Sequence, residues 1–219
     1  STVLAEYAHP STQFLDGKHV TCEPMGGVEV IDLPEPWGKC EFMYSPHSEQ
    51  LTVPLAEGIA EKGIREFTWK LHLPHREHEA WVGLVKAGFG DFNEAVEVNG
   101  VSVKPLDVLT KVIQRNIDRN ASSIPAQESH EIHFAIGRGK KDGRPAVARC
   151  DVIVTPDAMY DGYVDACTSM NASIAVQLIL KHPLKPGVYA PEGYFDAATY
   201  FKEVEKRKFM VTKSVEYLD

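Results

Sequence analysis

The chain has 219 residues, enough to bury a substantial core, and its 43% hydrophobic and 25% charged content is ordinary for a globular protein. The formal net charge of -8 argues against nucleic acid as a partner. Its 4 cysteines form no C-x-x-C pair, which argues against a structural zinc site and, without a signal peptide, predicts reduced thiols in the cytoplasm. The most apolar run, residues 172–180, is too short to cross a membrane.

Short strands are predicted in the first third of the chain. Residues 18–25 and 27–33 are strand candidates on either side of Gly26. Residues 39–45 (KCEFMYS) alternate after a proline-rich turn signal, and residues 66–73 (EFTWKLHL) carry Phe, Thr and Trp in a pattern that favours a strand.

Two amphipathic helices are predicted in the middle of the chain. Pro74 opens the first, which ends near Gly88, and Pro105 opens the second, over residues 105–120. The expected buried stripe of the first consists of Trp81, Leu84, Val85 and the aliphatic part of Lys86. The second has apolar residues at spacings of three and four, namely Leu106, Leu109, Ile113 and Ile117.

The last third is predicted as a hairpin followed by helices. Residues 130–155 alternate as two strands around a turn over residues 137–143. Residues 163–181 form a helix with small or apolar side chains on most faces, which suits a surface that is covered. A helix over residues 196–206, capped by Asp196, precedes a strand over residues 209–217. Without regular βαβ alternation, this order predicts an α+β fold, with a mixed, mostly antiparallel sheet and helices packed on one face.

A phosphate-binding loop is not expected. The glycine-rich, basic segment from Gly137 to Gly143 lies between two alternating strands, and it matches neither G-x-G-x-x-G nor the P-loop pattern. The sequence therefore predicts a hairpin turn there and no cofactor-binding residue in this chain.

Three histidines at regular spacing do not match a known metal-binding motif. His72, His75 and His78 recur every third residue, but their order with the interleaved glutamates fits neither H-E-x-x-H nor H-x-x-E-H. An exposed polar helix start is the favoured interpretation, and a metal-dependent hydrolase is kept as an alternative. His130 and His133 are an odd number of residues apart on one strand, so a two-histidine site is not expected there.

Polar residues where strands end are the candidates that remain. Cys167 lies inside a helix that looks buried, with Asp165 nearby, so it is interpreted as a packing cysteine. His47 and Glu49 follow one predicted strand, while Lys70 and His72 close another. A lysine or histidine at such a position can bind a carboxylate or move a proton.

Three segments carry a resemblance to a known family. The closing segment, with Ser169–Met170, Ala172, Ala175 and GVYAPE, resembles the C-terminal end of the saccharopine dehydrogenase-like oxidoreductases, which include lysine and carboxynorspermidine dehydrogenases. MYSPHSEQLTVP is similar to the family's His-x-Glu, Thr and Pro run. EFTWKLHLPHREHEAWVGLVKAGFGD is similar to its Lys-Thr-Leu-Arg-Tyr-Pro-Gly-His motif, with Thr68 kept and Lys70 in place of arginine.

The resemblance implies that residues 1–219 are a substrate-binding and dimerisation domain, and that NAD or NADP is bound by an N-terminal Rossmann domain outside this chain. It implies an enzyme that acts on an amino-acid-derived C–N bond, inactive without that domain, and a homodimer. Lysine in place of arginine loses bidentate carboxylate recognition, which argues against saccharopine itself as substrate. The implied catalytic residues are Lys70 and His72, and the implied substrate contacts are His47, Glu49, Thr68 and Glu192. A non-catalytic oligomerisation or binding module is the alternative.

Overall fold

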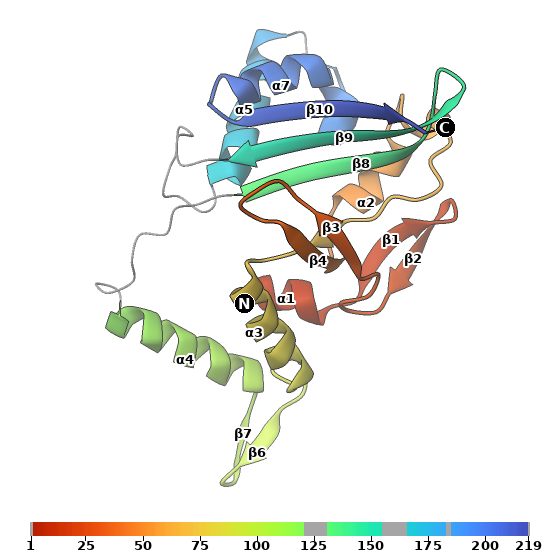
Figure 1. Cartoon of the computed structure of the whole chain (residues 1–219). Coiled ribbons are helices and arrows are strands. Elements are labelled where there is room, and N and C mark those ends of the chain that lie inside the picture. Colours follow the sequence, from red (N-terminus) through yellow and green to blue (C-terminus); the bar gives the residue numbers. More distant parts are fainter. Residues whose placement is uncertain (1, 121–130, 155–165, 183–184, 219) are drawn as a thin grey trace. The chain divides into compact units, whose positions relative to one another are not determined.

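The computed structural model describes residues 2–120, 131–154, 166–182 and 185–218. The chain divides into two compact units, Ser1–Ser123 and Ile124–Asp219 (Figure 1). Both units combine α-helices with antiparallel sheets, so the predicted α+β class is confirmed. Within these described ranges, none of the helices has both the length and the apolarity needed to cross a membrane.

The described part of the first unit holds three small antiparallel sheets. β1 (Ser11–Leu15) pairs with β2 (Lys18–Cys22), and β6 (Val96–Val98) pairs with β7 (Val101–Val103). β4 (Lys39–Tyr44) is the central strand between β3 (Glu29–Asp32) and β5 (Lys70–Leu71). β4 therefore links the strand that carries Glu29 to the strand that carries Lys70.

Helices surround these strands. α1 (Thr2–Ala8) packs against α3 (His75–Lys86), while α2 (Glu49–Thr52) and the 3-10 turns η1 (Val53–Leu55) and η2 (Ala60–Lys62) connect β4 to β5. α4 (Pro105–Asn120) follows the β6–β7 hairpin and has no buried residue. The apolar core of the unit contains Leu4, Tyr7, Phe14, Leu33, Cys40, Phe42 and Met43.

The described part of the second unit is a three-stranded sheet with helices on one face. β8 (Glu131–Lys141) and β9 (Arg144–Val154) form a hairpin, and β10 (Met210–Tyr217) adds to the other side of β9. Figure 1 shows α5 (Ala166–Lys181) and α7 (Ala197–Glu205) beside this sheet; the short α6 (Pro191–Tyr194) precedes α7. The core between helices and sheet consists of Val154, Cys167, Met170, Ile174, Leu178, Val204 and Phe209.

Only one side of α5 is covered by this core. Met170, Ile174 and Leu178, four residues apart, are buried. Val176 and Leu180 are 56% and 80% exposed on the remaining surface of the helix. The apolar character that the sequence shows around the whole helix thus corresponds to a buried inner face and an exposed apolar outer face.

The structure corrects three details of the predicted elements. The hairpin turn is only Asp142–Gly143, both at positive φ, because Asp-Gly favours a two-residue turn and lets β8 continue through Lys141. Residues 66–73 do not form one strand, because Phe67 bridges to Phe14 whereas β5 pairs with β4. In α3 the most buried side chain is His78, not the predicted stripe, whose Lys86 is exposed.

Candidate functional site

A buried polar cluster holds the segment that follows β4. Gln13 and Ser45 are fully buried, and the Gln13 amide nitrogen donates to the Ser45 carbonyl oxygen at 3.4 Å. The Gln13 amide oxygen accepts from the backbone N–H of Trp69 at 2.8 Å, and the Gln50 amide nitrogen donates to the Ser45 carbonyl oxygen at 3.3 Å. These bonds fix residues 45–50 against the chain entering β5, because buried polar groups keep their partners.

His47 and Glu49 contact each other in the segment that follows β4. His47 Nδ1 donates a hydrogen bond to a Glu49 carboxylate oxygen, and this bond lowers the pKa of Glu49. The imidazole of His47 stacks on the indole of Trp69, with ring centroids 4.0 Å apart and planes 2° apart. Both side chains are partly exposed, so the pair can meet a ligand.

Lys70 and Glu29 form an ion pair on the β3–β4–β5 sheet. Lys70 Nζ lies 2.7 Å from Glu29 Oε2, and the side chains are 14% and 44% exposed. Nζ also lies 5.4 Å from the ring centroid of Tyr44, the residue opposite Lys70 in the register. Because side chains alternate along a strand, Lys70 points away from the face on which Trp69 lies.

His72 lies on the same face as Lys70, two residues further on. Its Nδ1 lies 2.8 Å from the carbonyl oxygen of Glu41, so the Nδ1–H donates and the neutral ring carries its lone pair on Nε2. The His72 and His78 rings are 4.9 Å apart, and His78 Nδ1 lies 3.1 Å from the hydroxyl of buried Tyr7. Both Nδ1 atoms thus serve protein groups. The metal-hydrolase alternative also requires His75, whose side chain is outside the described part.

Thr68 and Glu192 belong to neither of these pairs. Thr68 lies just before β5, between Phe67, which bridges to Phe14 in β1, and Trp69, whose backbone N–H donates to the Gln13 side chain. Glu192 is in α6, in the second unit, whereas the other five predicted site residues are in the first. Its Oε1 is buried and has no hydrogen-bond partner among the residues that the structure describes.

The second unit contains a cluster that the sequence analysis missed. Glu131 and His133 on β8 and Cys167 on α5 present donor atoms that all lie within 4.8 Å of one another. Cys167 Sγ donates to Glu131 Oε2 at 2.8 Å, and His133 Nε2 lies 3.5 Å from the same oxygen. Hydrogen bonding to Cys167, and then to Glu131, raises the pKa of His133, and the bond from His133 lowers the pKa of Glu131.

The interpretation of Cys167 as only a packing cysteine is therefore incomplete. Cys167 is buried in the core, as expected, but its sulfur also meets two polar groups. The overlooked signal is the i, i+2 spacing of Glu131 and His133, which places both on one face of a strand. That face is the one that α5 covers, because their β9 partners, Val154 and Val152, pack against the helix. His130, the other member of the predicted histidine pair, is outside the described residues.

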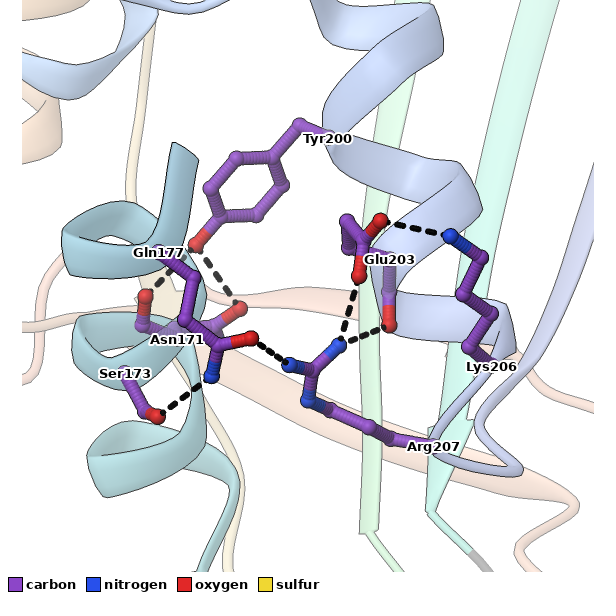
Figure 2. A network of polar contacts seen from close by, with 7 residues as sticks. All are labelled: Asn171, Ser173, Gln177, Tyr200, Glu203, Lys206 and Arg207. Atoms are coloured by element: carbon purple, nitrogen blue, oxygen red, sulfur yellow. Dashed lines mark hydrogen bonds and ion pairs between the residues drawn. The ribbon is translucent and has the colours of Figure 1, made fainter. Parts of the chain in front are cut away.

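A hydrogen-bonded network joins α5 to α7 (Figure 2). The guanidinium of Arg207 donates to the Glu203 carbonyl oxygen at 2.7 Å and to Gln177 Oε1 at 3.1 Å. Lys206 Nζ lies 2.6 Å from Glu203 Oε1, and these cations lower the pKa of Glu203 to about 2. The network holds α7 against the helix that carries Cys167.

The sheets in the described part of the chain are all antiparallel, so a strand–loop–helix phosphate site between parallel strands is absent from that part. The segment from Gly137 to Gly143 is the end of β8 and the hairpin turn. No protein-family model matches the chain.

Proposed function

We propose that residues 1–219 are the substrate-binding and dimerisation domain of a saccharopine dehydrogenase-like, NAD(P)-dependent oxidoreductase that acts on an amino-acid-derived C–N bond. The observation that carries this proposal is the Lys70–Glu29 ion pair on the sheet face that also holds His72. The dinucleotide belongs to a Rossmann domain outside residues 1–219, where nicotinamide supplies the hydride chemistry.

The Lys70–Glu29 pair suits the two charges of an amino acid. An entering α-carboxylate can pair with the Lys70 ammonium while the substrate ammonium pairs with the Glu29 carboxylate, so each protein charge exchanges one partner for another. Because Glu29 is 44% exposed, the exchange does not require a buried charge to be left alone. A single lysine holds a carboxylate as a point charge rather than as a bidentate fork.

His72 is the proposed proton-transfer residue. With Nδ1–H bonded to the Glu41 carbonyl oxygen, the ring is oriented so that Nε2 is its basic atom. An imidazole nitrogen held in a fixed orientation suits proton transfer at a substrate nitrogen. His47 stacks on Trp69, on the face opposite Lys70, so His47, Glu49 and Thr68 are not assigned to the contact that Lys70 and His72 make with the substrate.

The exposed apolar face of α5 is a surface that another domain of the proposed oxidoreductase would cover. Val176, Ile179 and Leu180 are exposed on this helix, and apolar area of this kind favours contact with another protein surface. We propose that the Rossmann domain covers it, and that a second copy of the chain forms the dimer.

Calorimetry and turnover test this proposal. We expect the 219-residue chain to bind no NAD(H), and the protein that includes the Rossmann domain to turn over an amino-acid substrate. Lys70→Met and Glu29→Gln should each raise KM about 10- to 100-fold, because each removes one charge-assisted contact. His72→Ala should instead lower kcat. Lys140→Met, on the exposed β8 end, is the matched control.

The outcomes separate the two hypotheses. Tight NAD(H) binding by residues 1–219 alone would contradict the domain assignment. Unchanged turnover in Lys70→Met and His72→Ala would favour the non-catalytic oligomerisation module.

A further inference from the structure

Glu131, His133 and Cys167 offer one oxygen, one nitrogen and one sulfur donor to a common point. The three donor atoms lie within 4.8 Å of one another, and the group is the one set of three potential metal ligands found among the described residues. A thiolate and an imidazole exclude Mg²⁺ and Ca²⁺ as preferred ions, because those cations select oxygen ligands. Mixed sulfur, nitrogen and oxygen donors suit Zn²⁺ and related ions.

The spacing of the nitrogen and oxygen donors agrees with tetrahedral coordination. Zinc bonds of ~2.1 Å to nitrogen and oxygen place those two atoms about 3.4 Å apart. The observed separation of His133 Nε2 and Glu131 Oε2 is 3.5 Å. A zinc–sulfur bond of ~2.3 Å would place sulfur and oxygen about 3.6 Å apart. The present S–H···O contact is 2.8 Å, so an ion would have to spread Cys167 and Glu131.

The scaffold holds the three ligands from two elements. Glu131 and His133 share the helix-facing side of β8, whose register with β9 is continuous. Cys167 belongs to the buried core of the unit, and the Asn171 amide nitrogen donates to the Cys167 carbonyl oxygen at 3.0 Å. This bond ties the helical turn at Cys167 to Asn171. The side chains of His133 and Glu131 are 60% and 26% exposed, which leaves the cluster open to water on one side.

We propose that Glu131, His133 and Cys167 bind one zinc-class divalent ion, with water as the fourth ligand. The site lies in the second unit and is independent of the substrate function proposed for Lys70 and His72. Because the ion would tie β8 to α5, binding would also stabilise this unit against unfolding.

Cobalt titration of the 219-residue chain tests the site directly. Co²⁺ added to reduced, metal-free protein should give a thiolate-to-cobalt charge-transfer band that saturates at one ion per chain, and Zn²⁺ should displace it. Cys167→Ser should abolish the band. His133→Ala and Glu131→Gln should weaken binding at least about tenfold, since even outer-shell changes cost that much. Zn²⁺ should raise the thermal unfolding midpoint of wild type but not of these variants.

Two matched controls keep the test falsifiable. Cys150→Ser removes another cysteine of the same sheet, and His182→Ala removes a histidine just after α5; both should titrate like wild type. A missing charge-transfer band, or equal affinity in wild type, His133→Ala and Glu131→Gln, would overturn the proposal and leave a hydrogen-bonded thiol. If Cys167→Ser fails to fold, His133→Ala and Glu131→Gln are checked for folding by circular dichroism. Their cobalt affinity, compared with that of wild type, then decides whether the site exists.

Discussion

The hydroxyl of Tyr200 on α7 donates to two oxygens of Asn171 on α5, the backbone carbonyl at 3.0 Å and the side-chain carbonyl at 3.1 Å (Figure 2). Asn171 in turn donates through its amide nitrogen to the carbonyl oxygen of Cys167 at 3.0 Å. One tyrosine thus connects the packing of α7 to the helical turn that presents the Cys167 sulfur. The candidate metal ligand and the helix pair are therefore parts of one polar arrangement.

Tyr200→Phe should destabilise the second unit modestly. The ring keeps its packing beside Phe195, whereas the hydroxyl bonds to Asn171 are lost. Loss of such a hydrogen bond costs about 0.5–1.5 kcal/mol. The free energy of unfolding from urea denaturation measures it. Tyr189→Phe is the control, because that hydroxyl donates to the nearby Pro186 carbonyl oxygen in an exposed segment. Equal losses in both variants would contradict a specific role for the Tyr200 contact.

Ile174→Ala should be the most damaging single change on α5. Ile174 is 0% exposed in the core beneath the helix, and removing its side chain leaves a cavity among close-packed neighbours. The expected loss is about 2–5 kcal/mol in the free energy of unfolding. Leu180→Ala, on the same helix but 80% exposed, should change it by less than about 0.5 kcal/mol. A comparable loss at Leu180 would show that the outer face is already covered in solution.

The Glu203 ion pairs should make stability depend on pH in the acid range. Hydrogen bonds from Lys206 and Arg207 lower the Glu203 pKa from 4.5 in the unfolded reference to about 2 in the folded chain. The stabilisation is therefore fully present above the unfolded pKa, and it is lost as the pH falls from that value through the folded one. Urea midpoints of wild type should fall more steeply over this window than those of Glu203→Gln. Glu205→Gln, two residues away, should follow wild type; parallel curves for wild type and Glu203→Gln would contradict the assignment.

Local patterns in the sequence were sufficient to predict most helices and strands. The Asp196 cap is confirmed by its bond from the Thr199 N–H at 2.7 Å, and the 39–45 and 209–217 strands are confirmed within one residue at each end. The strand β1 was not predicted. One of its faces carries the buried polar residues Ser11 and Gln13, because a polar cluster replaces hydrophobic contact there. A pattern of hydrophobic alternation cannot detect such a strand.

The candidate sites were less predictable because they depend on pairings between distant residues. Lys70 was predicted as a functional residue, but its partner Glu29 is 41 residues earlier and meets it only through the β3–β4–β5 order. The Glu131–His133–Cys167 cluster requires the register of β8 and the position of α5 at the same time. Spacing along the chain reveals a motif only when its ligands are close in sequence.

Gly27→Ala tests how closely the first unit holds the aromatic ring beside Lys70. Gly27 has φ +58, and a Cβ there would overlap the Tyr44 ring, so the ring would have to move. Gly38→Ala is the matched control: its φ of +62 imposes a similar backbone penalty of about 1–2 kcal/mol, but its Cβ would enter open space. Gly27→Ala should lose a further ~1–3 kcal/mol in the free energy of unfolding through the overlap.

Because Tyr44 lies against the Lys70 ammonium, Gly27→Ala should also raise KM for the proposed amino-acid substrate, whereas Gly38→Ala should not. Equal unfolding free energies in the two variants would mean that the Tyr44 ring yields without cost, and that it does not fix the position of Lys70.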